Sequence, residues 1–171
     1  MLFRSLIGDN YQLKIADFDG AYLKSEGGSP SCRGTKNYRA PELIDGECEN
    51  PSAADVYSAG VILFCFMTGS LPYMEDVKFD DCDLQELILD NNPLFWEVHP
   101  NLQEGDLDLS EDFKKLFMSM IRRDPSKRIT IKDIMRNKWY NGPTYSDTKL
   151  KNIMEFKMAF LKSKAASMTA F

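Results

Sequence analysis

The feature that most constrains the fold is a long apolar segment at residues 52–68. After Asp55 nearly every residue of this segment is apolar or small, and Gly69 follows it directly. Ser52 and Asp55 have the spacing of an N-terminal capping box, so we predict a helix that begins at Ser52 and stops at Gly69. A helix that is apolar all round has to be buried on all sides. The segment therefore predicts a central helix around which other helices pack.

Four further helices are predicted from apolar residues that recur at helical spacing. We expect them at residues 81–91, 110–123, 130–137 and 146–164. The helix at 110–123 has two acidic residues in its first turn and Arg122 and Arg123 in its last, which suits the helix dipole. Thr130 and Asp133 repeat the capping-box spacing at the start of another helix.

Two short strands are predicted near the N-terminus, at residues 6–7 and 13–16, because a turn sequence around Gly8 separates two apolar stretches. Residues 25–32 are small, polar and rich in glycine and proline, which indicates an exposed mobile loop. The predicted fold is therefore mainly α-helical, with a small β-hairpin at its N-terminal edge.

Composition excludes several classes of protein. A chain of 171 residues with 43% hydrophobic and 27% charged residues is typical of one soluble globular domain. The net charge of −5 argues against nucleic-acid binding through general basicity. The four cysteines lack Cys-x-x-Cys spacing and His99 is the single histidine, so a His/Cys metal site is not expected.

No membrane span or export signal is expected either. The longest apolar run, residues 61–67, is far shorter than the roughly 20 residues that cross a bilayer. The first residues do not have the pattern of a signal peptide. Together with the unpaired cysteines, these features predict an intracellular, cytoplasmic protein.

Three motifs follow one another in the N-terminal part of the chain. They are D-F-D at residues 17–19, G-T-K-N-Y-R-A-P-E at 34–42 and D-V-Y-S-A-G-V-I-L at 55–63. In this order they resemble D-F-G, G-T-x-x-Y-x-A-P-E and D-V-W-S-x-G-V-x-L of eukaryotic Ser/Thr protein kinases. D-P-S-K-R at 124–128 is similar to the family's later D-P-x-x-R. The resemblance implies a kinase C-terminal lobe at residues 1–141 and a C-terminal helical extension at 142–171.

The resemblance implies a role for each matched residue. Asp17 takes the place of the aspartate that holds Mg²⁺ against the nucleotide phosphates. Thr35 and Tyr38 belong to the substrate-binding loop. Glu42 and Arg128 are expected to form a buried ion pair that ties this loop to the end of the lobe.

Two residues permit two interpretations each. In a complete kinase domain, Asp55 is implied to accept hydrogen bonds from the backbone of the catalytic loop, and the alternative is a helix cap alone. Ser31 lies four residues before Thr35, where many kinases carry an activating phosphate. The alternative for Ser31 is an ordinary loop serine.

Phosphoryl transfer in this family also needs a glycine-rich loop, a strand lysine, a helix glutamate, a catalytic aspartate and a second metal ligand. None of these motifs occurs in residues 1–171. The second metal ligand is an asparagine thirteen residues before the D-F-G aspartate, and here that position holds Arg4. Because a guanidinium group has no acceptor atom, Arg4 cannot bind Mg²⁺ and could instead neutralise Asp17. Asp19 replaces the glycine of the motif.

Three hypotheses about function result. The chain is a piece of a Ser/Thr kinase that is inactive alone, a non-catalytic pseudokinase-like binding or scaffold module, or an active phosphotransferase of reduced form. No cofactor is expected for the chain alone, whereas ATP and Mg²⁺ are expected if it is part of a complete kinase. A protein substrate or partner suits each case, and the oligomeric state is open. The lysine-rich terminal helix either docks on its own domain or binds a partner.

Overall fold

The computed structural model describes residues 4–8, 11–18, 21, 25, 34–46, 48–74, 83–103 and 107–168. They fall into two units, one formed mainly by residues 18–141 and one by residues 3–17 with 142–171. Ser31, Asp19 and most of the predicted loop at 25–32 lie outside the described residues.

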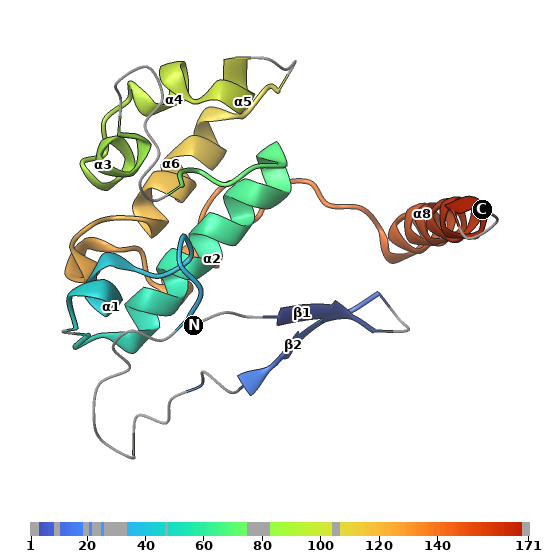
Figure 1. Ribbon diagram of the computed structural model, residues 1–171, viewed down its shortest axis with the longest axis horizontal. Coiled ribbons are helices and arrows are strands. Elements are labelled where there is room, and N and C mark those ends of the chain that lie inside the picture. The colour runs from blue at the N-terminus through green and yellow to red at the C-terminus, as the bar shows by residue number, and fades with distance from the viewer. Residues whose placement is uncertain are drawn as a thin grey trace. The chain divides into compact units, whose positions relative to one another are not determined.

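The unit at residues 18–141 is built from helices (Figure 1). In chain order they are α1 (Pro41–Asp45), α2 (Pro51–Thr68), α3 (Leu84–Leu89), α4 (Phe95–Val98), α5 (Pro100–Gln103), α6 (Glu111–Met120), the short 3-10 helix η3 (Pro125–Lys127) and α7 (Ile131–Ile134). The prediction of a mainly α-helical fold is confirmed.

The central helix α2 begins one residue earlier than predicted. Its N-cap is Asn50, whose Oδ1 accepts a hydrogen bond from the Ala53 backbone N–H at 3.2 Å. The predicted cap at Ser52 is wrong because Pro51 takes the first helical position, where its fixed φ and missing N–H cost nothing. Gly69 ends the helix as predicted, with a φ of 75° and its N–H bonded to the Cys65 carbonyl at 2.9 Å.

Burial of α2 is one-sided, so the prediction of burial on all sides is wrong. Asp55, Ile62 and Phe66 lie on one stripe of the helix; the first two are half-buried, and Phe66 is 73% exposed. The opposite face carries the side chains that form the core. By length and composition alone α2 could also cross a membrane, and it is the one helix of the described residues that could, but half of it is buried inside the protein.

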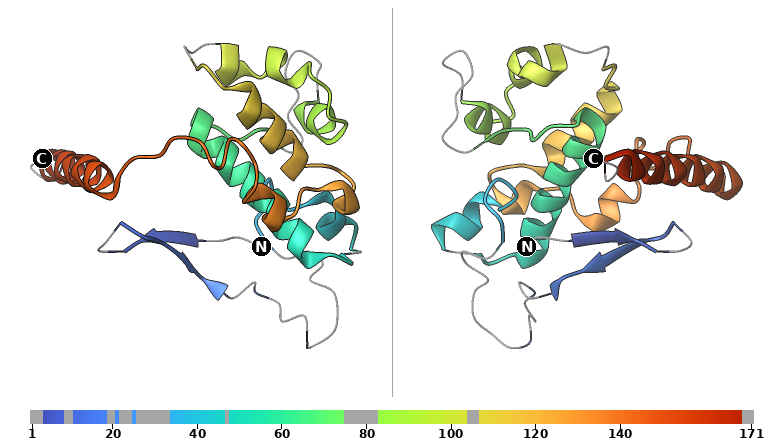
Figure 2. Two further views of the ribbon diagram at one scale, coloured as in Figure 1. Left: turned by 180° about the vertical axis from the view of Figure 1, so that it is seen from behind. Right: turned by 45° about the vertical axis from the view of Figure 1, so that its right-hand side comes forward.

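The core lies between α2 and α6, which run side by side in both views of Figure 2. Gly60 permits their close approach, because a Cβ there would lie 3.0 Å from the Cβ of Met120. Aromatic rings fill the adjoining space, and the centroids of Phe64 and Phe117 are 4.8 Å apart. The other rings of this cluster belong to Phe95, Trp96, Phe113 and Trp139.

His99 is buried beside these rings, with a 2% exposed surface. Its Nε2 lies 3.1 Å from the Leu71 carbonyl oxygen, and its ring makes edge contacts with Phe64 and Phe95. Since a carbonyl only accepts, Nε2 carries the proton and Nδ1 is left buried without a partner among the described residues. Burial lowers the pKa of His99, because the charged imidazolium would be desolvated.

Three of the predicted helices, α3, α6 and α7, are shorter than the sequence predicts. α6 is capped by Ser110 and ends at Met120, so Arg122 and Arg123 lie beyond its last turn, contrary to the prediction. Their backbone carbonyls accept hydrogen bonds from Arg128 instead of continuing the helix. α3 begins after its cap Asp83, and α7 begins at the predicted cap Thr130 but ends at Ile134.

The other unit contains a strand pair and a helix. β1 (Arg4–Ile7) and β2 (Leu13–Ala16) pair antiparallel, with Arg4 opposite Ala16. α8 (Asp147–Met168) runs past the predicted end at residue 164.

Candidate functional site

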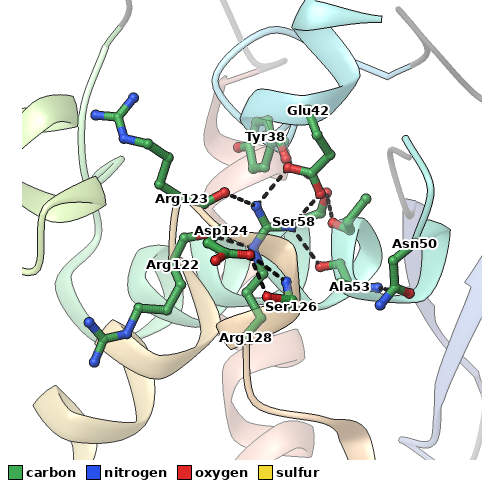
Figure 3. Close-up of polar contacts among 11 residues, drawn as sticks. Tyr38, Glu42, Asn50, Ala53, Ser58, Arg122, Arg123, Asp124, Ser126 and Arg128 are labelled. Atoms are coloured by element: carbon green, nitrogen blue, oxygen red, sulfur yellow. Dashed lines mark hydrogen bonds and ion pairs between the residues drawn. The ribbon is translucent and has the colours of Figure 1, made fainter. Parts of the chain in front are cut away.

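A buried ion pair joins two distant parts of the helical unit (Figure 3). Glu42 is the second residue of α1, and Arg128 directly follows η3. Nη1 and Nη2 of Arg128 donate to Oε1 and Oε2 of Glu42 at 2.5 and 2.7 Å. The side chain of Arg128 is 0% exposed and that of Glu42 9%. The two residues thus form the bidentate geometry that makes arginine–carboxylate pairs strong.

Every donor of the Arg128 guanidinium has an acceptor. Besides the two bonds to Glu42, Nε donates to the Arg122 carbonyl at 2.7 Å, Nη1 to the Ala53 carbonyl at 3.1 Å and Nη2 to the Arg123 carbonyl at 3.2 Å. These account for all five N–H groups of an arginine. A single side chain therefore holds together α1, the first turn of α2 and the segment after α6.

Two tyrosines extend this network inside the core. The Arg128 Cζ lies 5.0 Å from the ring centroid of Tyr57, and the Tyr57 hydroxyl lies 2.7 Å from that of Tyr73. Burial first, and Tyr73 second, raise the pKa of Tyr57 well above its ordinary value. The Tyr57 hydroxyl therefore stays neutral and hydrogen-bonded at physiological pH.

The segment before α1 is held on α2 at Tyr38. The Ser58 hydroxyl, fully buried on α2, donates to the Tyr38 carbonyl at 2.8 Å. The Tyr38 side chain packs partly against the core, and burial, followed by the nearby Cys65 thiol, raises the pKa of its phenol. Thr35 is exposed, and its carbonyl accepts from the Tyr38 N–H at 3.2 Å. The loop is thus fixed at one end, while Thr35 faces solvent.

Asp55 occupies the first half of α2 and is half-buried. Burial raises the pKa of its carboxyl. Within the described part of the chain, no hydrogen bond to this carboxylate is formed. The interpretation of Asp55 as a helix cap is wrong, because Asn50 caps α2.

Asp17 directly follows β2, with an exposed side chain and a backbone φ of 64°. The strand register places the backbone of Arg4 opposite Ala16, one residue before Asp17. Mg²⁺ requires several oxygen ligands, and the guanidinium of arginine offers none. The described residues at this position supply one carboxylate, so they do not fit the family's two-ligand magnesium site.

The structure brings Glu42 and Arg128 into contact and links Tyr38 to α2. Asp17 belongs to the other unit, and Ser31 lies outside the described residues. Sequence reasoning missed the role of Ser58 as the residue that holds the loop. The signal was present, because Ser58 is the serine of the D-V-Y-S-A-G motif, which matches the serine of the family's D-V-W-S-x-G. Sequence reasoning also missed the Tyr57–Tyr73 contact, for which no sequence signal was present.

Comparison with known proteins matches residues 5–140 to the protein kinase domain family. The SNF1-like protein kinase ssp2 of Schizosaccharomyces pombe is 36% identical over 143 residues, 80% of this chain and 22% of its own length. The Serine/threonine-protein kinase GIN4 of Saccharomyces cerevisiae is 34% identical over 77% of this chain and 11% of its own. The Serine/threonine protein kinase OSK3 of Oryza sativa subsp. indica is 35% identical over 79% and 24%. The chain spans less than a quarter of the length of these relatives.

The matched residues include the loop before α1, the ion pair between Glu42 and Arg128, and the helix α2 that holds the loop. The resemblance drawn from the motifs is therefore confirmed, and this chain belongs to the protein kinase domain family.

Proposed function

We propose that the chain supplies the substrate-loop part of a Ser/Thr protein kinase domain, a family whose reaction is the ATP-dependent phosphorylation of protein Ser and Thr side chains. The observation that carries the proposal is the anchor made by Glu42, Arg128 and Ser58. It fixes the residues from Tyr38 to α1 on the helical core and leaves Thr35 exposed. A loop that is held at one end and open at the other suits the binding of an extended protein substrate.

The polypeptide of residues 1–171 does not transfer phosphate by itself in this proposal. Arg4 stands where the family has its second metal ligand, and its backbone lies beside the strand that leads to Asp17. A positively charged side chain at that position repels Mg²⁺ and offers it no ligand. It therefore disfavours the metal ion that bridges the phosphates of ATP in the family. ATP and Mg²⁺ act only where further kinase-domain sequence completes the site.

The partly exposed stripe of α2 supports this dependence on further sequence. Asp55 is a half-buried carboxylate with a raised pKa, and Phe66 on the same stripe is 73% exposed. A carboxylate and an apolar side chain in this arrangement suit a face that the catalytic-loop segment covers in a complete domain. Residues 1–141 then form the kinase part and 142–171 an extension, with Ser31 as a regulatory phosphosite in the loop between the motifs.

A second candidate is a non-catalytic, pseudokinase-like binding module. Arg4 favours it, because the same substitution would weaken metal binding even in a longer protein. In that case the anchored loop binds a protein without phosphorylating it.

Thermal unfolding with and without Mg·ATP tests the proposal. We expect no rise in the melting temperature of the 171-residue protein, for the wild type and for Asp17→Ala alike. A ligand present at 100 times its dissociation constant would stabilise the folded state by about 2.7 kcal/mol, which such a scan detects easily. Stabilisation of the wild type that Asp17→Ala abolishes would show that the chain holds the nucleotide and would refute the inactive assignment.

A further inference from the structure

A groove of about 630 Å³ lies on the helical unit between the turn after α3 and the helix α6. This volume falls within the range of roughly 300–1,000 Å³ that is typical of ligand sites. Its lining includes Pro93 from the turn, Trp96 from α4 and Met118 from α6. Neither the ion pair nor the substrate loop contributes a side chain to the groove. Arg122, which lines the groove, touches the ion pair only through its backbone carbonyl, which accepts a hydrogen bond from Arg128.

The apolar part of the groove is held rigidly by the core. The ring of Trp96 lies 5.0 Å from that of Phe95 and 5.6 Å from that of Phe117, measured between centroids. Trp96 is only half-buried, and its remaining surface lines the groove together with Met118. Large aromatic side chains held in this way are the usual anchors of protein interfaces, because little side-chain entropy is lost on binding.

The charged part of the groove carries more positive than negative side chains. Lys114 is paired with Glu111 at 2.8 Å. In the described part of the chain, Lys115, Arg122 and Glu97 form no ion pair, although Lys115 also acts electrostatically on Glu111. The lining as a whole has three basic and two acidic side chains, in a chain whose net charge is −5. Anionic ligands are therefore attracted to this groove against the sign of the whole protein.

We propose that this groove binds an acidic, extended peptide segment of a partner protein. An aromatic or large apolar side chain of the peptide packs on Trp96 and Met118, and its carboxylates pair with Lys115 and Arg122. The proposal does not rest on phosphoryl transfer, because none of these residues belongs to the substrate loop or to the position of Asp17.

The structure offers a variant that removes the charge without disturbing the anchor. Arg122 contributes only its backbone carbonyl to Arg128, at 2.7 Å, so Arg122→Ala retains that hydrogen bond. Lys115 is exposed on α6. The double variant Lys115→Ala/Arg122→Ala is therefore expected to fold, and Lys132→Ala, an exposed lysine on α7 outside the groove, is its matched control.

The test is fluorescence anisotropy with a labelled synthetic peptide of glutamates and aspartates around one phenylalanine, measured at low ionic strength on the 171-residue protein. A second peptide replaces the phenylalanine by alanine. Circular dichroism and the melting temperature establish that each variant is folded. Because there are only two tryptophans in the chain, a change in tryptophan fluorescence on binding reports contact near Trp96 or Trp139.

We expect saturable binding that is about tenfold weaker in the folded double variant, which corresponds to about 1.4 kcal/mol, and unchanged in Lys132→Ala. The peptide without phenylalanine should also bind several times more weakly. The proposal is overturned if the wild type does not bind the phenylalanine peptide at up to about 1 mM. It is also overturned if the double variant binds this peptide as tightly as Lys132→Ala does, or if the wild type binds the two peptides with equal affinity.

Discussion

Replacing Glu42 by alanine is the most informative perturbation of this structure. The substitution removes two of the five hydrogen-bond acceptors of Arg128 and leaves a positive charge whose side chain is 0% exposed. The three backbone carbonyls around the guanidinium carry only partial negative charge. Nothing else in its described surroundings can neutralise it.

Breaking a buried pair by removing one partner typically costs about 3–5 kcal/mol, because the other charge stays desolvated. The whole free energy of unfolding of a domain is only about 5–15 kcal/mol. We therefore expect Glu42→Ala to lower the melting temperature by roughly 6–20 °C, at about 2–4 °C per kcal/mol. The folded fraction at physiological temperature would fall accordingly.

The assay is thermal or urea unfolding followed by circular dichroism, with Arg123→Ala as the control. Arg123 makes an exposed pair with Glu86 at 2.6 Å, and its backbone carbonyl, which serves Arg128, survives the substitution. Exposed pairs contribute about 0.2–1 kcal/mol, so this variant should unfold close to the wild type. Equal small effects of the two substitutions would refute the assignment of Glu42 and Arg128 as the anchor.

The other predictions concern single groups. Asp55→Asn should raise the urea midpoint at pH 7. The pKa of Asp55 is raised in the folded protein, so its ionised carboxylate lowers the free energy of unfolding at pH 7, and the neutral amide removes that cost. A lower midpoint would contradict this. The pKa of His99 is lowered in the folded protein, so its contribution to stability is fully present above pH ~6.5 and is lost as the pH falls below that value, by up to about 1.4 kcal/mol per pH unit. His99→Gln should reduce this pH dependence of the free energy of unfolding, measured by urea unfolding between pH 7.5 and 5. Tyr73→Phe should cost about 1 kcal/mol by removing the partner of the Tyr57 hydroxyl, and an unchanged midpoint would show that this bond is dispensable. Ser31→Ala should leave the melting temperature unchanged, whereas a clear shift would give Ser31 a structural role.

The sequence allowed the family, the helical fold and the Glu42–Arg128 pair to be predicted, because each depends on a recognisable pattern of residues. It did not predict Ser58, the third residue of the anchor. Gly69 and Thr130 mark helix ends by their own backbone and side-chain chemistry. The cap of α2 was misplaced because Asn50 and Ser52 are both good caps, and only Pro51 decides between them.

Long-range contacts could not be predicted in the same way. α6 ends at Met120, and the carbonyls of Arg122 and Arg123 beyond it accept hydrogen bonds from Arg128, several residues downstream. The one-sided burial of α2 likewise depends on which segments pack against it, and its composition is apolar on every side. The groove at Trp96 results from the packing of α4 on α6, which no motif encodes.

The most direct test of the proposed function is transfer of radiolabelled γ-phosphate from Mg·ATP to a generic basic protein substrate, with the purified 171-residue chain as the only enzyme. The proposal predicts incorporation no greater than with Asp17→Ala or without protein, because Arg4 holds the place of the second metal ligand. Incorporation that grows with the concentration of the wild-type chain and disappears in Asp17→Ala would contradict it.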